Sequence, residues 1–481
     1  ETNDESLSEK DNINFQEMKR EHLLISSLPQ AVAAMLDPAD CGPAFIGLCQ
    51  DTQELSFEYP VEFFAERIHH VPRPRPDIKQ LNQALEIIKT AKRPLIISGG
   101  GVIYSGAEKE VSDFANQHGI PIAETIAGKG SMTHNSPQHV GPIGIIGSSS
   151  ANLMAANADV VIAIGTRLQD FTTGSWTAFA HDAKFVSINT ARWDATKHLA
   201  IAVIGDARET IKELNAYLFG KVEGLDGGKK NIKFKGSDIK NWSADENWKQ
   251  KGAEAFKSWN NLLTELQAPT NAKLPSYAQV VGIVNDLADP QDTLVTAAGG
   301  LPGEVSKGWR VKNPNTFDCE FGFSCMGYEI SGAWGAKIAQ DEREPDNDVI
   351  TFCGDGSYLM LNSDIYSSVL SKKKIIALVL DNGGFAVINK LQNNTGNESF
   401  NNLIKDCPTI PEPFGVDFVA HASSMGATAE KVANAAELKE AFKRAKASEK
   451  TYVIVMDVDP YEGWTTEGHA WWEVGTSHVT T

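Results

Sequence analysis

Residues Asp348–Ser357 of this 481-residue chain read DVITFCGDGS, an apolar run that ends on a Gly-Asp-Gly turn. A continuous apolar run of this length, bounded by turn residues, is typical of a strand buried on both faces of a parallel sheet. A second run, Lys374–Leu380 (KIIALVL), ends on the residues DNGG (381–384). The pattern therefore predicts two neighbouring parallel strands, with Asp355 and Asn382 side by side at their carboxyl ends, where open α/β sheets bind ligands.

Oxygen ligands gather at this predicted edge. The carboxylate of Asp355, the amide oxygen of Asn382 and a carbonyl of the following glycine turn form a hard half-shell, which Mg²⁺ typically completes with phosphate oxygens and water. The glycines on either side of Asp355 let a phosphate approach the backbone without meeting a Cβ. A plain strand-turn-helix of any doubly wound domain can also contain Gly-Asp-Gly, so the motif by itself leaves an ordinary turn open.

Composition narrows the class of protein. A net charge of −18 at pH 7 argues against nucleic acid or an anionic membrane surface as a partner. No apolar stretch approaches the roughly 18–20 residues that span a bilayer, and the N-terminus has no signal-peptide pattern. The six cysteines form no CxxC pair, which predicts mostly buried, reduced thiols. We therefore expect a cytoplasmic enzyme without nucleic acid or membrane partners.

Two α/β units follow one another along the chain. In residues 73–218, predicted helices alternate with strands at Pro94–Ser98, Ile120–Glu124, Asp159–Gly165 and Lys184–Asn189, which predicts a mostly parallel sheet. Residues 219–272 are interpreted as a linker, with Trp242, Trp248 and Trp259 on a helix that docks on the surface. The second α/β unit is predicted over 273–460, and a tail over 461–481.

The N-terminal part has a different composition. Residues 1–16 are polar and acidic without periodicity, and are interpreted as a surface segment. A helix is predicted over Lys19–Leu36 and a strand over Ala44–Leu48, before a proline-containing connector. Because one helix and one strand cannot form a domain alone, residues 1–72 are interpreted as the end of something larger.

Two further segments of the second unit carry chemistry. The strand predicted at Leu294–Ala298 ends on GGLP (299–302), a second glycine turn at a carboxyl end. Residues 317–336 (FDCEFGFSCMGYEISGAWGA) form a predicted loop that enters a helix and contains Met326. By itself, Met326 would be interpreted as a residue that fills a gap in the core.

Taken together, these motifs resemble the thiamin-diphosphate-dependent enzymes. Gly-Asp-Gly with its distant asparagine is similar to their diphosphate motif. The segments CEFGFSCMGYE and AAGGLPGE are more particular, and resemble the 3D-trihydroxycyclohexane-1,2-dione hydrolases of myo-inositol catabolism. The resemblance covers nearly the whole chain through LPSYAQVVGIVN (274–285), AAGGLPGEVSKGW (297–309), TFDCEFGFSCMGYEISGAWGAK (316–337), GDGSYLMLNSDI (354–365), RPLIISGGG (93–101), ETIAGKGSM (124–132) and IGTRLQDFTTGS (164–175).

The resemblance implies a thiamin-diphosphate-binding fold with pyrimidine-binding, central and diphosphate-binding domains. Two of these would be doubly wound parallel sheets, and residues 1–72 would be the C-terminal remnant of the first domain. It also implies a set of site residues. The metal ligands are expected at Asp355, Asn382 and Gly384. Cofactor contacts are expected at Gly299, Gly300, Leu301, Ser324, Met326, Gly356 and Ser357, with Met326 as the prop beneath the cofactor rings.

The activating glutamate of the resembled family lies well upstream in the pyrimidine-binding domain. We therefore expect it in a missing N-terminal part and expect no catalytic residue in this chain. By position, Glu17, Glu21 and Glu54 are interpreted as surface charges. The active site is expected at the subunit interface of a homodimer or homotetramer, and whether this chain alone is active stays open.

The activity implied by the resemblance is hydrolysis of a C–C bond in a cyclic 1,2-diketone, trihydroxycyclohexane-1,2-dione, to 5-deoxyglucuronate, with thiamin diphosphate and Mg²⁺. Two alternatives stay open, an acetolactate-synthase-like carboligase or decarboxylase and a non-catalytic structural homologue. FAD is not expected, because Tyr104 stands where the dinucleotide fingerprint after Gly99 needs its third glycine. The Asn-rich segment Gly383–Pro413 is predicted to be a mobile lid. Its Asn389, Gln392 and Asn393 are candidate contacts for a polyol.

Overall fold

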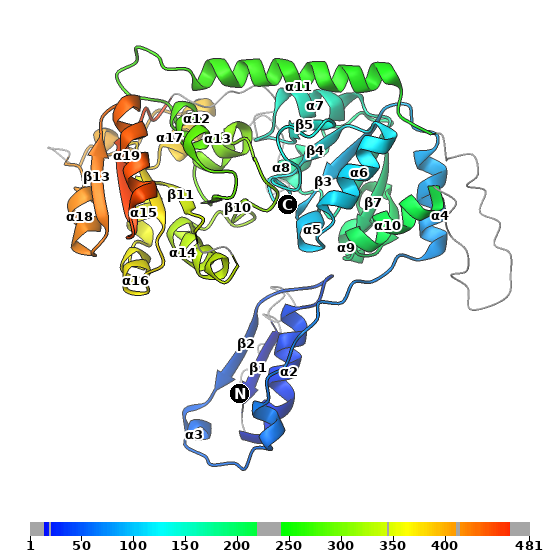
Figure 1. The fold of residues 1–481 in the computed structure, drawn as a ribbon, viewed down its shortest axis with the longest axis horizontal. Helices are drawn as coiled ribbons and strands as arrows, with labels where there is room; N and C mark the ends of the chain where they lie inside the picture. Colours follow the sequence, from blue (N-terminus) through cyan, green and yellow to red (C-terminus); the bar gives the residue numbers. More distant parts are fainter. Residues whose placement is uncertain (1–13, 19–20, 219–241, 344–345, 410–413, 462–481) are drawn as a thin grey trace.

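The computed structural model describes residues 14–18, 21–218, 242–343, 346–409 and 414–461. Two six-stranded sheets lie side by side, and a smaller N-terminal unit stands apart from them (Figure 1). Every strand pair in both sheets is parallel. The predicted α/β class with two doubly wound sheets is therefore confirmed.

The central sheet has the order β5-β4-β3-β6-β7-β8. Its strands are β3 (Pro94–Ser98), β4 (Ile122–Glu124), β5 (His139–Pro142), β6 (Val160–Ile164), β7 (Lys184–Asn189) and β8 (Ile201–Ile204). Its helices are α4 (Ile78–Ile88), α5 (Gly100–Tyr104), α6 (Glu108–His118), α7 (Ser149–Asn157), α8 (Asp170–Thr173), α9 (Arg192–Ala195) and α10 (Ala207–Leu218), with the 3₁₀ turn η3 (Lys197–Leu199). Alternate residues of β3 pack into two different cores, Ile96 on one face and Leu95 and Ile97 on the other. Helices on both faces explain why this strand is a continuous apolar run.

The C-terminal sheet has the order β10-β9-β11-β12-β14-β13. Its strands are β9 (Thr293–Thr296), β10 (Phe317–Cys319), β11 (Val349–Gly354), β12 (Ile376–Asp381), β13 (Thr428–Val432) and β14 (Tyr452–Asp457). Its helices are α12 (Tyr277–Leu287), α13 (Leu301–Gly308), α14 (Tyr328–Asp341), α15 (Asp355–Met360), α16 (Asp364–Leu370), α17 (Ala386–Asn394), α18 (Phe418–Ser424) and α19 (Ala435–Ala447), with the turn η5 (Ile404–Asp406). Gly354 at the end of β11 is opposite Leu380 on β12. This register brings the turns after both strands to the same edge of the sheet, as the sequence predicts.

A single long helix, α11 (Glu246–Gln267), runs along both units (Figure 1). It contacts α7 and β5 of the central unit and α12 of the C-terminal unit. Trp248 donates from its indole nitrogen to the Pro94 carbonyl at 2.8 Å, and Trp259 is buried. The predicted docking helix therefore exists, although Trp242 lies before it and packs on His118. Residues 219–241 of the predicted linker lie outside the described residues.

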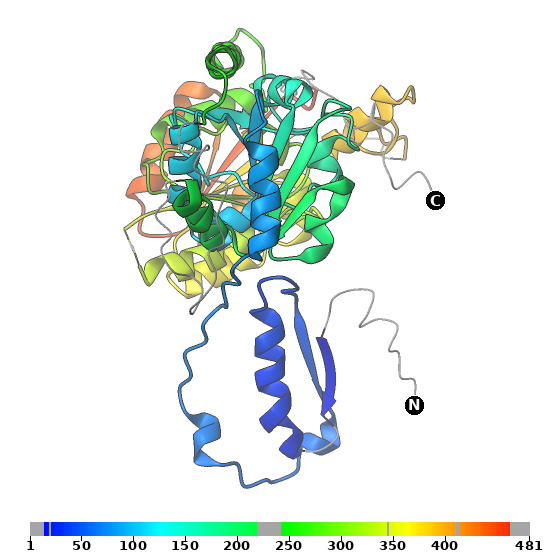
Figure 2. The same ribbon diagram turned by 90° about the vertical axis from the view of Figure 1, so that its right-hand side faces the viewer.

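The N-terminal unit contains β1 (Asn14–Met18), η1 (Glu21–Leu23), α2 (Leu24–Met35), β2 (Ala44–Leu48), α3 (Gln50–Gln53) and η2 (Val61–Phe64). Figures 1 and 2 both show it separate from the two sheets. The interpretation of residues 1–16 as an irregular surface segment is wrong at its end, because residues 14–16 belong to strand β1, which pairs in parallel with β2. The composition of the segment does not reveal this distant partner. Residues 1–13 lie outside the description, and the domain boundaries at 72, 218, 272 and 460 stay predictions.

All six cysteines are free. The prediction that most of their thiols are buried is wrong, since only that of Cys353 is buried and Cys41 and Cys325 are exposed. Both exposed cysteines lie in loops, where an apolar neighbour in sequence does not imply burial. Among the described residues, no helix combines the length and the apolar character needed to cross a membrane.

Candidate functional site

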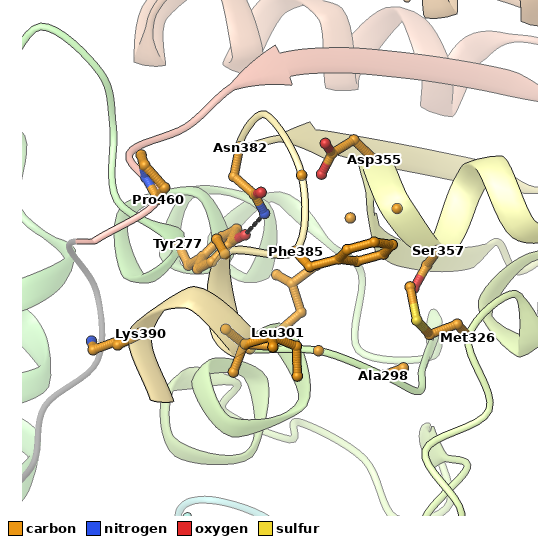
Figure 3. A pocket seen from close by; sticks show the side chains of 18 of the residues that line it. Tyr277, Ala298, Leu301, Met326, Asp355, Ser357, Asn382, Phe385, Lys390 and Pro460 are labelled. Atoms are coloured by element: carbon orange, nitrogen blue, oxygen red, sulfur yellow. Dashed lines mark hydrogen bonds between the residues drawn. The ribbon is translucent and has the colours of Figure 1, made fainter. Parts of the chain in front are cut away.

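All ten residues predicted to contact the cofactor or the metal line one pocket at the carboxyl edge of the C-terminal sheet (Figure 3). Four chain segments supply them. They are Gly299, Gly300 and Leu301 after β9; Ser324 and Met326 before α14; Asp355, Gly356 and Ser357 after β11; and Asn382 and Gly384 after β12. The fold therefore assembles the predicted set, and the binding role of each residue stays a prediction.

Three buried oxygens of pocket residues have no hydrogen-bond partner among the described residues: Oε1 of Glu304, and the two that follow strands β11 and β12, Oδ1 of Asp355 and Oδ1 of Asn382. The Asn382 amide nitrogen donates to the Tyr277 hydroxyl at 2.5 Å (Figure 3). This bond leaves the amide oxygen available as an acceptor. Buried acceptors are costly unless something binds them. A carboxylate oxygen and an amide oxygen left in this way fit a hard cation such as Mg²⁺.

The electrostatics of Asp355 support the same fit. Burial raises the pKa of this carboxyl to about 7, and the neighbouring charge of Asp381 acts in the same direction. Backbone N–H groups of Asn382, Gly356 and Gly384 lower the pKa but do not cancel burial. A divalent cation at this position would instead favour the ionised carboxylate.

Glycines shape the floor of the pocket. A Cβ on Gly299 would meet no atom within 4 Å, so this backbone is open to a ligand. A Cβ on Gly356 would lie 2.8 Å from the Phe385 ring and 3.3 Å from Cε of Met326. Met326 and Phe385 therefore flank the Gly356 backbone, and only glycine leaves both side chains where they are.

The loop that carries Ser324 is held in an unusual conformation. Ser324 has a φ of 53°, in the left-handed region. The Glu320 carboxylate accepts hydrogen bonds from the backbone N–H groups of Phe323 and Cys325 on either side of it. Because these bonds fix both neighbours, they stabilise the turn and the direction of the Ser324 carbonyl.

Several pocket residues were missed at the sequence level. Tyr277, at the start of α12, and Glu304, on α13, both line the pocket. Burial raises the pKa of the Glu304 carboxyl to about 7, while the positive charges of Lys307 and Lys390 act in the opposite direction. Glu304 falls within the AAGGLPGE segment, which could have drawn attention to it. No local pattern marks Tyr277, because only tertiary packing brings it to Asn382.

Lys390 and Pro460 lie at one end of the pocket. Lys390 on α17 is half-buried, and its ammonium donates to the Tyr461 carbonyl at 3.4 Å. Figure 3 shows Lys390 and Pro460 at the end opposite Met326. The pocket therefore extends from Met326, across the orphaned oxygens that follow β11 and β12, to a cation.

The segment Gly383–Pro413 contains a helix, α17, and its role as a mobile lid stays a prediction; residues 410–413 lie outside the described part. The three candidate polyol contacts do not line the pocket. Asn389 is fully buried, Gln392 accepts from Asn402, and Asn393 donates to Ser399 at 3.2 Å. Gln392 and Asn393 therefore bond within the segment, which a count of polar residues cannot distinguish from contacts with a ligand, whereas both side-chain polar atoms of Asn389 have no partner among the described residues.

The triple glycine of the central sheet also has a structural explanation. A Cβ on Gly99 would lie 2.3 Å from the Gly165 carbonyl oxygen, and one on Gly101 would lie 2.7 Å from the Gly165 Cα. These glycines therefore let two loops pack backbone against backbone. Tyr104, at the position of the absent third glycine, is exposed.

Comparison with protein families matches two domain models to this chain. Residues 81–214 match the thiamine pyrophosphate enzyme central domain, and residues 297–456 match the thiamine pyrophosphate enzyme C-terminal TPP-binding domain. The first range contains the central sheet, and the second contains all ten predicted site residues.

Similar proteins include three bacterial enzymes named 3D-(3,5/4)-trihydroxycyclohexane-1,2-dione hydrolase. The one from Bacillus licheniformis is 37% identical over 473 residues, which is 96% of this chain and 72% of the relative. Those from Shouchella clausii and Listeria innocua are each 36% identical, covering 96% and 97% of this chain and 72% of each relative. Identity of this extent shows common descent along almost the whole chain. The chain therefore belongs to the thiamine pyrophosphate (thiamin diphosphate) enzyme family.

Proposed function

We propose that this enzyme binds thiamin diphosphate through Mg²⁺ and hydrolyses a C–C bond of a cyclic 1,2-diketone. The proposed substrate is trihydroxycyclohexane-1,2-dione, with 5-deoxyglucuronate as the product, in myo-inositol catabolism in the cytoplasm. The names of the similar proteins support the substrate. The observation that carries the cofactor role is the pocket, in which the orphaned buried oxygens of Asp355 and Asn382 lie beside open glycine backbone.

Each group of pocket residues has a proposed task. Asp355, Asn382 and the Gly384 carbonyl would hold Mg²⁺, and Tyr277 would keep the Asn382 amide oriented. Gly299, Gly300, Leu301, Gly356 and Ser357 would bind the diphosphate through backbone and hydroxyl groups. Met326 would support the rings, and the Ser324 carbonyl would accept from the aminopyrimidine. When bound, the thiazolium supplies an electron sink for C–C cleavage, while these residues orient it and exclude water.

We further propose that a second copy of the chain covers this pocket, as a homodimer or homotetramer. Large apolar side chains are exposed on and beside the segments that form the site: Phe323, Leu359, Met360, Phe385 and Ile388. Large apolar side chains exposed around a pocket are typical of an interaction surface. Among the described pocket residues only Asp355 and Glu304 carry carboxylates; Asp355 has the proposed metal role, and the charges of Lys307 and Lys390 act on Glu304. The activating glutamate would therefore come from outside this described pocket.

The substrate is tested by incubating the enzyme with thiamin diphosphate, MgCl₂ and the cyclic dione, and following the product by NMR. We expect ring opening to 5-deoxyglucuronate, lost when Mg²⁺ is chelated. Pyruvate serves as the comparison substrate. Acetolactate formation without ring opening would instead favour the carboligase alternative. A chain that binds the cofactor and turns over neither substrate would favour the non-catalytic homologue.

A further inference from the structure

One buried carboxylate joins three of the four segments that form the pocket, and it does not itself line the pocket. Glu329, on the first turn of α14, is 1% exposed. Its Oε1 accepts from the backbone N–H of Ala298 at 3.1 Å, and its Oε2 accepts from the backbone N–H of Gly327 at 2.8 Å. The Ser357 hydroxyl also hydrogen-bonds this carboxylate.

The three donors come from different parts of the site. Ala298 directly precedes the Gly299–Leu301 turn, and Gly327 directly follows Met326. Ser357 lies in the first turn of α15, two residues after Asp355. One side chain thus connects the two segments predicted to hold the diphosphate with the segment that carries the ring support. The Asn382 segment is held separately, through Tyr277.

We propose that Glu329 is a positioning residue that sets the distance between the diphosphate-binding turns and Met326, so that both ends of thiamin diphosphate are bound at once. The inference rests on the proposed cofactor role and not on the proposed substrate. It goes beyond the ten predicted residues, because Glu329 acts through the backbone of its neighbours. A pre-organised site of this kind needs its supporting groups locked by hydrogen bonds.

An ionised carboxylate suits this task because both of its oxygens accept hydrogen bonds and neither donates. Burial raises the pKa of Glu329, and the N–H donors of Ala298 and Gly327 oppose that rise. A glutamine has the same shape but only one acceptor oxygen. In Glu329→Gln, the amide NH₂ must therefore face either Ala298 or Gly327, and the link between the two segments is broken on one side.

The test compares two ligands by calorimetric titration in the presence of Mg²⁺. Thiamin diphosphate needs both ends of the pocket, whereas inorganic pyrophosphate needs only the diphosphate turns. In Glu329→Gln we expect the affinity for thiamin diphosphate to fall about tenfold, as the loss of one buried hydrogen bond implies. The affinity for pyrophosphate should fall by a clearly smaller factor, because pyrophosphate does not need Met326, although Glu329 also links the Ala298 and Ser357 segments to each other.

A matched control separates positioning from stability. Glu124 of the central sheet is also 1% exposed and accepts from the backbone N–H groups of Gly130 and Met132. Glu124→Gln should lower the thermal midpoint without changing the ratio of the two affinities. If Glu329→Gln does not fold, Glu329→Asp provides the same test, because its shorter side chain cannot reach both donors.

The ratio of the two affinities decides the outcome. A selective loss of thiamin diphosphate binding in the Glu329 variant supports the inference. An equal loss of both affinities, or no loss of either, overturns it while leaving the cofactor role in place. A wild-type chain that binds neither ligand overturns the proposed cofactor role, and this inference with it.

Discussion

The two six-stranded sheets have the same parallel architecture and differ at their carboxyl edges. In the central sheet, Glu124 bonds with backbone N–H groups and with His139 at 3.0 Å. Its glycines there pack backbone on backbone. In the C-terminal sheet, Asp355 and Asn382 keep orphaned oxygens, and Gly299 faces open space. The carboxylate of Glu124 is satisfied by the chain itself, although a cavity lined by Gly100, Gly165 and Thr166 also lies at that edge of the central sheet. The oxygens of Asp355 and Asn382 are left for a ligand.

The pKa values of the two buried carboxyls express the same difference. Burial raises the pKa of Glu124, but His139, Lys129 and the Met132 N–H together bring it below its usual range. Burial raises the pKa of Asp355 to about 7, because its surroundings supply too little positive charge. A buried carboxylate that lacks its counter-charge inside a pocket is a sign of a binding site. The comparison therefore indicates that the missing hydrogen-bond and charge partners of Asp355, and not the fold that both sheets share, mark it as a candidate ligand site.

The largest expected effect is on the Mg²⁺-dependent affinity for the cofactor. Asp355→Ala should lower the Mg²⁺-dependent affinity for thiamin diphosphate by at least about 100-fold, since it removes the charged oxygen that would bridge the cation to the protein. Isothermal titration calorimetry measures it. Asp206→Asn is the control, because Asp206 is a buried carboxylate beyond β8 of the central sheet, paired with Arg73 at 3.0 Å. Unchanged affinity in Asp355→Ala would contradict the assignment of the site.

The second expected effect is a dependence of cofactor affinity on pH. A cation binds the ionised carboxylate, and a pKa of about 7 for Asp355 means that protons compete with the cation below that pH. The affinity for Mg²⁺ and cofactor should therefore fall about tenfold between pH 8 and pH 6, as the ionised fraction of Asp355 does, and level off above pH 8. Titrations over this range in wild type and Asp355→Asn measure it. The variant should lose the pH dependence, and an affinity that rises on acidification would exclude the explanation.

A third test replaces a glycine by alanine at the carboxyl edge of each sheet, Gly101 in the central sheet and Gly300 in the C-terminal sheet. Gly101→Ala places a Cβ 2.7 Å from the Gly165 Cα, where the contact is backbone on both sides. It should lower the free energy of unfolding by about 2–4 kcal/mol. Gly300→Ala meets only Tyr277 at 3.8 Å and Val387 at 3.9 Å, so its stability should change by less than about 0.5 kcal/mol.

Gly300→Ala should instead lower cofactor affinity about tenfold, because its methyl group occupies space at the diphosphate turn. Thermal melts and titrations of both variants measure the two effects. Equal destabilisation by the two substitutions would remove the distinction drawn between the edges.

The smallest expected effect concerns the cation at the end of the pocket. Lys390→Met should weaken thiamin diphosphate binding about three- to fivefold at low salt, since a half-buried ammonium attracts the diphosphate only partly screened by water. The difference should shrink as ionic strength rises. Lys197→Met is the control, because Lys197 pairs with Asp194 at the edge of the central sheet. A salt-independent loss would mean that packing, and not charge, is responsible.

Local sequence patterns predicted most of the two sheets. The strands β3 and β7 begin and end where the apolar runs do, and β11 and β12 differ from their predicted bounds by one or two residues. Such runs are reliable because burial on both faces demands apolar residues throughout. Five strands of the two sheets were not predicted: β5, β8, β10, β13 and β14. Strand β5 (HVGP) is short and contains glycine and proline, and β10 lies in a segment that was predicted to be a loop. Strand β1 was missed because its only support is a distant partner, β2.

The sequence predicted those site residues that lie in glycine turns and loops near the ends of strands. All ten residues come from turns whose chemistry is local, and the resemblance to a family assigned their expected roles. Tyr277 and Lys390 could not be found in this way, since each enters the pocket from a helix face. For Gln392 and Asn393 composition was misleading, because polar residues also serve contacts within their own segment, and Asn389 is buried away from the pocket.

By itself, the amino-acid sequence determined which segments are buried strands, and where glycine leaves backbone open at their ends. Both properties depend on neighbours within a few residues. Only the tertiary structure decided that an oxygen of Asp355 stays without a partner while the carboxylate of Glu124 is satisfied by the chain. It also decided that Glu329 joins Ala298, Gly327 and Ser357. These outcomes depend on hydrogen bonds between segments far apart in the chain, and a donor and an acceptor meet only after the sheets have packed.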